Sequence, residues 1–195
     1  MKRVHKFTKN WLLSLFFLFL LFLLSASASA DQNDVRLAEL FRSLKSTESV
    51  KRASVFERKI WHIWMEHYDP EVESAMFQGV EAMKLQQFEQ AFGHFSLMIK
   101  LAPDYAEGWN KRATVLYLMG RFKESEADVM RTLELEPRHF GALSGQGLIR
   151  IAFQDWTGAI YFLESALKIN PHMRGVIMNL KYARKKQKES LTCCF

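Results

Sequence analysis

Apolar residues recur at intervals of three and four through most of the chain, and this spacing predicts amphipathic helices rather than strands. One helix covers residues 106–119 and ends at Gly120. A second covers residues 123–136 and stops before Pro137, because the residue before a proline is pushed away from helical geometry. The two helices make a hairpin, and similar hairpins on both sides of it predict an all-α fold.

The hairpins repeat with a period of 34 residues. Three of the four prolines keep this spacing: Pro103, Pro137 and Pro171. An aromatic residue stands 15 positions before each of them (Phe88, Phe122 and Trp156), and a small residue stands 12 positions before (Ala91, Ser125 and Ala159). A fixed period of this length indicates stacked repeats, in which each unit buries its apolar face against the next.

This pattern resembles the tetratricopeptide repeat (TPR) family. The middle unit, residues 106–139, matches the family through Trp109, Gly120, Phe122, Glu124, Leu133 and Pro137. The first unit is residues 72–105, and the third is residues 140–173. At one position where the family usually has leucine, the three units carry Gln78, Arg112 and Gln146. The resemblance covers 102 of 195 residues and implies a right-handed superhelical stack of helical hairpins, an α-solenoid.

Both flanks of the array are predicted to be caps, since the end of a repeat stack needs an element with one polar side. Residues 31–71 predict an N-terminal helical hairpin, a degenerate repeat whose Ile60, Trp61 and Trp64 face the first repeat. Residues 174–189 predict a C-terminal capping helix, and residues 190–195 a short tail. That helix carries one apolar stripe: Val176, Leu180 and Ala183.

The first thirty residues have the three parts of a secretory signal peptide. A basic start is followed by an apolar stretch over residues 11–24 and by Ala28-Ser29-Ala30, which suits a signal peptidase. We expect cleavage after Ala30 and export to the periplasm, as in the small exported repeat proteins of Gram-negative, alphaproteobacteria-like bacteria that the chain resembles. The alternative is retention of residues 11–30 as an inner-membrane anchor, because they form a charge-free run of 20 residues. Membrane association is expected only in that case.

Charge and cysteine content exclude some classes of function. The formal net charge is +6, but the leader carries four basic residues and no acid, which leaves +2 for residues 31–195. This balance disfavours a nucleic-acid partner, which requires clustered basic residues on the folded domain. The two cysteines, Cys193 and Cys194, are adjacent at the tail, so no disulfide scaffold is expected; their role stays open.

No motif predicts catalysis, a cofactor or a metal site, and we expect a protein that is not an enzyme. His62 and His67 are five residues apart, not the four that place two histidines on one helix face around zinc. The Gly145-Gln146-Gly147 run lacks the serine of a nucleophile elbow, and its glycines are expected to serve close helix contact. Glu124 and Asp128 are expected on a solvated face balanced by Arg121 and Arg131.

The resemblance implies a concave groove lined by the first helix of each repeat. Its candidate peptide-binding residues are Glu73, Met76, Val80 and Met83, then Glu107, Asn110, Thr114 and Tyr117, then Ser144, Leu148 and Ile151. The lining is apolar with few charges and suits an apolar or aromatic peptide segment of a protein partner. It does not match the carboxylate-clamp subtype, because Met76, Val80 and Gly145 stand where polar partners are needed. The alternative is a self-associating, homo-oligomeric envelope protein whose groove is filled by its own N-terminal hairpin.

Overall fold

The computed structural model describes residues 31–192, so the predicted signal peptide and the Cys193–Cys194 pair lie outside the described residues. Within that range the chain forms nine helices and no strands, which confirms the all-α prediction. They are α2 (Arg36–Ser46), α3 (Val50–Met65), α4 (Pro70–Lys84), α5 (Phe88–Leu101), α6 (Ala106–Leu118), α7 (Phe122–Leu135), α8 (Phe140–Ala152), α9 (Trp156–Ile169) and α10 (Arg174–Thr192).

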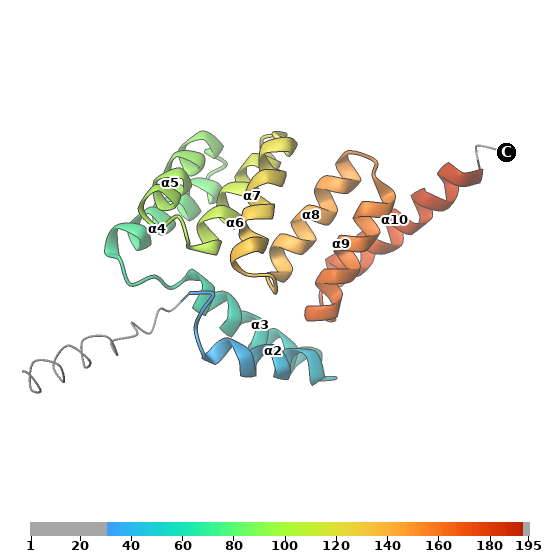
Figure 1. Cartoon of the computed structure of the whole chain (residues 1–195), viewed down its shortest axis with the longest axis horizontal. Coiled ribbons are helices and arrows are strands. Elements are labelled where there is room, and N and C mark those ends of the chain that lie inside the picture. Colours follow the sequence, from blue (N-terminus) through green and yellow to red (C-terminus); the bar gives the residue numbers. More distant parts are fainter. Residues whose placement is uncertain (1–30, 193–195) are drawn as a thin grey trace, which may run out of the picture.

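Three hairpins, α4–α5, α6–α7 and α8–α9, stack side by side in chain order, and α10 packs against α9 (Figure 1). The helix pairs follow the 34-residue period, so the predicted α-solenoid of helical hairpins is confirmed.

Each hairpin turns in the same way. The turn residue has a left-handed backbone in all three: Gln86 (φ 58°), Gly120 (φ 74°) and Gln154 (φ 58°). The next amide N–H donates to the carbonyl five residues earlier, at 2.9 Å each time: Gln87 to Ala82, Arg121 to Leu116 and Asp155 to Arg150. This is the Schellman arrangement that ends a helix with a left-handed residue.

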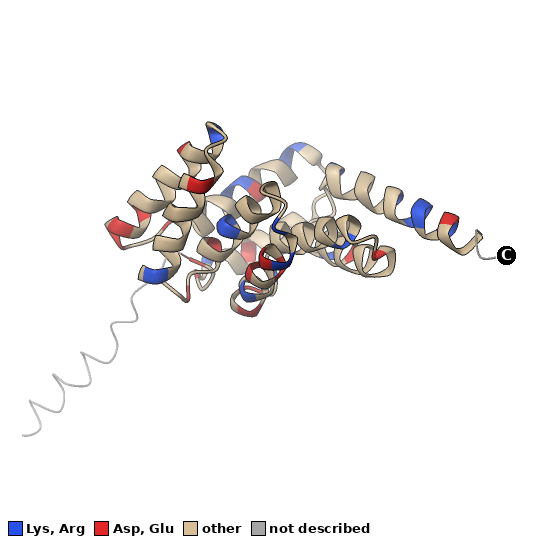
Figure 2. Cartoon of the chain, turned by 90° about the horizontal axis from the view of Figure 1, so that it is seen from above, with Lys and Arg blue, Asp and Glu red and all other residues tan. Residues whose placement is uncertain are grey.

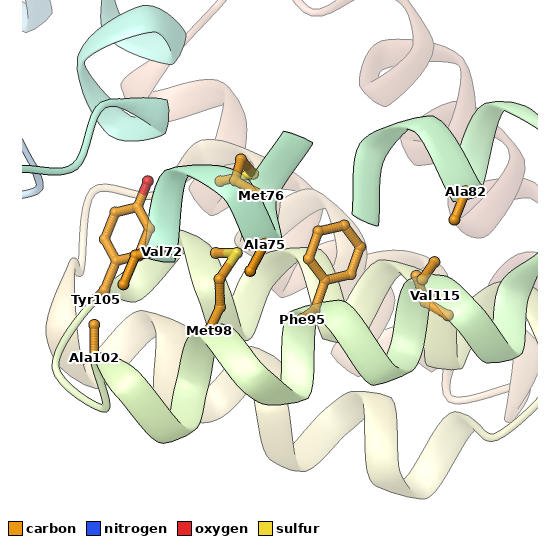
Figure 3. Close-up of a cluster of buried hydrophobic side chains, with 10 residues drawn as sticks. Val72, Ala75, Met76, Ala82, Phe95, Met98, Ala102, Tyr105 and Val115 are labelled. Carbon is orange, nitrogen blue, oxygen red and sulfur yellow. The ribbon is translucent and has the colours of Figure 1, made fainter. Parts of the chain in front are cut away.

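Within a hairpin, the two helices are matched in side-chain size at their closest approach. A Cβ atom on Gly79 would lie 2.4 Å from the ring of Phe95, and one on Gly147 would lie 2.6 Å from Leu163. In the second hairpin, where Ala113 replaces the glycine, the facing residue is the smaller Val129. Figure 3 shows Phe95 pointing from α5 toward α4 among the buried residues of the first hairpin.

The N-terminal hairpin, α2–α3, does not continue the stack. It lies across the array, and its main contacts are with α6, α8 and α9 (Figure 1). Phe140, Ile169 and Met173 complete its apolar cluster. The prediction that Ile60, Trp61 and Trp64 face the first repeat is therefore wrong, because Trp61 and Trp64 contact His139 and Phe140 at the start of the third.

The link between α3 and α4 explains this placement. Glu66 and Asp69 have extended backbones (ψ 138° and 119°), which lets the chain change direction before Pro70 starts α4. The Asp69 carboxylate accepts the Glu71 N–H and caps the new helix. The aromatic and imidazole rings at the start of α8 then give the tryptophans a flat surface to pack on.

The last helix, α10, buries the predicted stripe of Val176, Leu180 and Ala183 against the third hairpin. It continues to Thr192, so residues 190–192, which were assigned to the tail, are helical. The Thr192 hydroxyl donates to the carbonyls of Lys188 and Glu189 in this last turn. Among residues 31–192 no helix combines the length and the apolar content needed to span a bilayer.

The positions that depart from the family's leucine form polar pairs. Arg112 holds Asp128 through two bonds, Nε to Oδ2 at 2.7 Å and Nη2 to Oδ1 at 2.8 Å. Gln146 donates to Glu126 across the boundary between the second and third hairpins. The expectation that Asp128 lies on a solvated face balanced by Arg131 is therefore wrong: Asp128 is buried, and Arg131 pairs with Glu134.

Candidate functional site

The first helices of the three hairpins, α4, α6 and α8, form one face, here called the groove face. A pocket of about 200 Å³ opens on it between α6 and α8, here called the central pocket. Five predicted site residues line it: Asn110, Thr114, Tyr117, Ser144 and Leu148. Its other lining residues are also uncharged: Ala113, Ser125, Val129, Gly141, Ala142 and Gly145.

Small residues on α8 create the central pocket. A Cβ atom added to Gly145 would touch only a methyl group of Val129, at 4.0 Å, so the glycine leaves open space above α7. Gly145 was expected to serve close helix contact, and that holds for Gly147 against Leu163 instead. Gly141 is four residues earlier on the same side of the helix and also lines the pocket, but a Cβ atom there would lie 2.6 Å from the Trp61 ring, so this glycine serves close contact with α3.

Two polar side chains of the central pocket have defined hydrogen bonds. Thr114 is exposed and donates its hydroxyl to the Asn110 carbonyl at 2.9 Å. The Asn110 side-chain nitrogen donates to Glu107 at 3.0 Å, which fixes the amide orientation. Its side-chain oxygen is thereby left as an acceptor. The ring of Tyr117 packs near Phe122 and forms an apolar wall.

A second pocket, of about 400 Å³, lies where α3 meets α4, and is here called the junction pocket. It collects three further predicted residues, Glu73, Met76 and Val80. Its other lining residues are Met65, Phe77, Glu81, Lys84 and Lys111. Sequence reasoning missed Met65, because nothing in the α3 sequence indicates that its last turn lies beside α4.

Glu107 does not offer a charge to the groove, because it is 1% exposed. Its carboxylate pairs with Lys111 at 3.0 Å and lies 2.9 Å from the Nε2 atom of His139. Burial alone would raise the pKa of Glu107, but Lys111 and His139 outweigh it and hold that pKa below its ordinary value. The Glu107 side chain therefore stays ionised inside the protein.

His139 joins this carboxylate to the N-terminal hairpin. Its Nδ1 atom accepts the Ala142 N–H at 3.0 Å and caps α8, so the proton sits on Nε2 and is donated to Glu107. The Trp64 ring stacks on the imidazole at 4.1 Å between centroids, and Lys111 lies over the Trp61 ring. The hairpin thus covers Glu107 but does not line the central pocket.

Two other predicted residues lie outside both pockets. Met83 packs against the apolar cluster of the first hairpin. Ile151 packs against the cluster of α8, α9 and α10, and lines a shallow hollow with Trp156 and Tyr182. The structure therefore brings together eight of the eleven candidate residues, in two pockets on one face.

Other chemistry is sparse in the described part of the chain. Among residues 31–192 no group of three His, Cys, Asp or Glu side chains is arranged to hold a metal ion. His62 pairs with Glu66 at 2.9 Å, and the Nδ1 atom of His67 accepts the Asp69 N–H. Lys and Arg are interspersed with Asp and Glu along the helices, as Figure 2 shows.

No protein-family model matches the chain. A TPR repeat-containing protein of Rhizobium etli is 36% identical over 125 residues, which cover 64% of this chain and 60% of that protein. The chain thus spans less than two thirds of this relative.

Two solved structures are similar in fold. The TPR2B domain of yeast Sti1, in a pHsp70 complex, superposes with a TM-score of 0.58 and 24% identity, covering 60% of this chain and 99% of that one. The first TPR of Spaghetti (RPAP3), bound to the HSP90 peptide SRMEEVD, superposes with a TM-score of 0.59 and 18% identity, covering 60% of this chain and 94% of that one. The repeat period, the stacked hairpins and the Rhizobium relative agree, and the chain is similar to tetratricopeptide repeat proteins in sequence and in fold.

Proposed function

We propose that this chain is a non-enzymatic protein–protein interaction module that binds a peptide segment of a partner along the groove face. The observation that carries the proposal is the central pocket, an uncharged hollow between two neighbouring hairpins with a fixed amide at its edge. The pHsp70 complex of the similar yeast domain and the HSP90-peptide complex of the similar Spaghetti domain support it.

The central pocket suits one apolar side chain of such a peptide. Tyr117, Val129 and Leu148 supply apolar contact, and the Asn110 oxygen and the Ser144 hydroxyl are available to the peptide backbone. Binding of this kind combines an apolar anchor with a few oriented polar groups.

A pull-down with two matched variants tests this function. Thr114→Arg puts a long charged side chain at the exposed rim of the central pocket, and Ala127→Arg puts the same side chain on the exposed surface of α7. The partner captured by the parent protein should be lost with Thr114→Arg and kept with Ala127→Arg, at unchanged helical content by circular dichroism. Equal capture by both variants would contradict binding at the central pocket.

The alternative, a self-associating protein whose groove is filled by its own hairpin, has one observation in its favour, the cover that α3 places over Glu107. The central pocket remains outside that cover, which favours the peptide-binding function. Sedimentation of the purified protein separates the two, because only the alternative requires an oligomer.

We also propose that the module works in the periplasm as an adaptor in envelope assembly, after removal of residues 1–30. The side chain of Gln32 supports a mature start at Asp31, because it donates to the Asp104 carbonyl at 2.6 Å and accepts the Ala106 N–H at 3.2 Å. The second residue after the expected cleavage position therefore already contacts the repeat array. Mass spectrometry of the protein from cells should give a chain that starts at Asp31; an intact leader would indicate the anchored form.

A further inference from the structure

The junction pocket is an apolar hollow that a three-hairpin array alone would not form. Met76 and Val80 make its floor within the first hairpin cluster. Met65 comes from α3, the N-terminal hairpin, and Phe77 stands at its rim. Both rim residues are exposed, Met65 at 41% and Phe77 at 67%, so a large apolar surface faces solvent here.

The two lysines around this pocket are already in ion pairs, whereas one of its carboxylates is not. Lys84 pairs with Glu81 at 2.6 Å, and Lys111 pairs with the buried Glu107 at 3.0 Å. Within residues 31–192 Glu73 makes no ion pair, and it is exposed on the first turn of α4. The available charge at the junction pocket is therefore negative.

A second observation agrees with a negative potential at this end of the groove face. Burial raises the pKa of Tyr105, and the carboxylates of Glu107, Asp31 and Glu73 raise it further. The Tyr105 hydroxyl lies beside the last turn of α3, where it donates to the Trp64 carbonyl at 2.6 Å.

We propose that the junction pocket binds a peptide that carries a large apolar side chain next to a lysine or arginine. The apolar side chain lies between Met65, Met76 and Phe77, and the cation pairs with Glu73. This inference rests on the proposed function, because it adds the chemistry of the partner segment to the same groove face. It also separates this chain from the Spaghetti domain, whose peptide, SRMEEVD, is acidic at its C-terminal end.

The same contacts disfavour binding of an acidic peptide at the junction pocket. An acidic peptide would have to compete with Glu81 and Glu107 for the two lysines and would lie next to the unpaired Glu73. Like charges brought together across an interface weaken binding and exclude wrong partners. The pocket therefore selects by charge as well as by apolar contact.

Selection from a displayed library of random peptides on the purified protein tests the inference. We expect enrichment of sequences with an aromatic or large aliphatic residue beside Lys or Arg. On the Glu73→Lys variant the preference beside the apolar residue should change to Asp or Glu. The matched control is Glu71→Lys, which makes the same charge change in the first turn of the same helix but does not line the pocket; its preference should stay basic.

Affinity measurements on one enriched peptide give the magnitudes. Glu73→Lys should weaken binding about fivefold or more, and the loss should shrink at high salt, because the pair is exposed. Phe77→Ala should weaken binding about tenfold, as expected for an aromatic anchor. Tyr161→Ala removes an equally exposed aromatic residue from α9 and should leave affinity unchanged.

Several results would overturn the inference. Enrichment of acidic sequences on the parent protein would contradict the charge selection, and so would a preference that Glu73→Lys leaves unchanged. Sedimentation that shows a dimer separated by Phe77→Ala would assign the pocket to a second copy. Peptides whose binding depends on Thr114 but not on Glu73 or Phe77 would leave the proposed function standing and remove this inference. No enrichment at all would count against both.

Discussion

The turn between the two helices of each hairpin depends on one residue with a left-handed backbone. Glycine occupies it in the second hairpin, at Gly120, while Gln86 and Gln154 occupy it in the other two. A residue with a Cβ atom is strained there by about 1–2 kcal/mol. In the first and third hairpins the hydrogen bonds of the turn therefore maintain the left-handed backbone despite this strain.

Replacing either glutamine by glycine should therefore stabilise the protein. We expect Gln86→Gly and Gln154→Gly to raise the free energy of unfolding by about 1 kcal/mol each, measured by urea denaturation. Gln90→Gly is the control, because Gln90 lies within α5, where glycine costs about 1 kcal/mol. A loss of stability in Gln86→Gly would mean that this turn is not left-handed in solution.

The buried Glu107 carboxylate gives a pH-dependent prediction. Its pKa is lowered on folding, so its contribution to stability is complete above its ordinary value of 4.5 and is lost as the pH falls through the lower folded value. Glu107→Gln leaves Lys111 without its buried partner and should cost about 3 kcal/mol at neutral pH.

The same variant should also lose less stability between about pH 5 and pH 3 than the parent, since the titrating group is gone. Chemical denaturation across this range measures both effects. Part of the acid sensitivity should remain, because Arg36 lowers the pKa of Asp34 and Arg121 that of Glu124. Identical pH profiles for parent and variant would contradict an ionised Glu107.

At the residue scale the sequence predicted the candidate site only through the family resemblance. It located eight of the residues that line the two pockets, because their positions follow from the repeat register. It missed the burial of Glu107, since Trp64, which stacks on the His139 ring beside that carboxylate, lies 43 residues earlier in the chain and outside the repeats. It also missed Met65 for the same reason.

At the scale of one hairpin, stability depends on the match between the small residue of the first helix and the large residue of the second. Gly79 faces Phe95, and Ala113 faces Val129. We expect Gly79→Ala to cost about 2 kcal/mol by overpacking, and Phe95→Val to cost about 1–3 kcal/mol by leaving a cavity.

The double variant should cost less than the sum, because it rebuilds in the first hairpin the pair that the second hairpin already has. A coupling of about 1–2 kcal/mol in a double-mutant cycle is the expected result. Gly93→Ala serves as the control, since its Cβ atom would meet nothing within 4 Å and α5 should gain from the better helix former. Additive losses would mean that the two residues do not face each other.

The three hairpins were predictable from sequence because the period, the prolines and the turn residue Gly120 are all visible along the chain. The position of the α2–α3 hairpin on the array could not be predicted from the sequence. The spacing of Ile60, Trp61 and Trp64 indicates an apolar helix face but carries no information on which surface covers it. That was decided by the extended link before Pro70 and by the rings of His139 and Phe140.

At the scale of the whole molecule, the N-terminal hairpin connects the second and third hairpins of the array. In a simple repeat array each unit contacts only its neighbours, so the ends fray separately. Here α2 packs against α9, and α3 packs against α6 and the start of α8. Opening of the third hairpin therefore also exposes the N-terminal one.

Trp64→Ala should reveal this coupling. Trp64 is 1% exposed, and its loss should cost about 3–5 kcal/mol. Hydrogen exchange should accelerate in α2, in α3 and also in the first turn of α8. Trp109→Ala is the comparison, because Trp109 is half-buried and should cost less, without any effect on α8. Unchanged protection of α8 from hydrogen exchange in Trp64→Ala would contradict the coupling between the N-terminal hairpin and the third hairpin.

The crossing of α3 over the array also sets an order of events in folding. Trp61 contacts Phe140, which lies 79 residues later in the chain, whereas each repeat hairpin closes within its own 34 residues. Contacts between distant parts of a chain form slowly, because a long loop must close first. The helices α2 and α3 are therefore synthesised before the three repeat hairpins but reach their final position after them, and the apolar face of α3 stays uncovered until the third hairpin has been made.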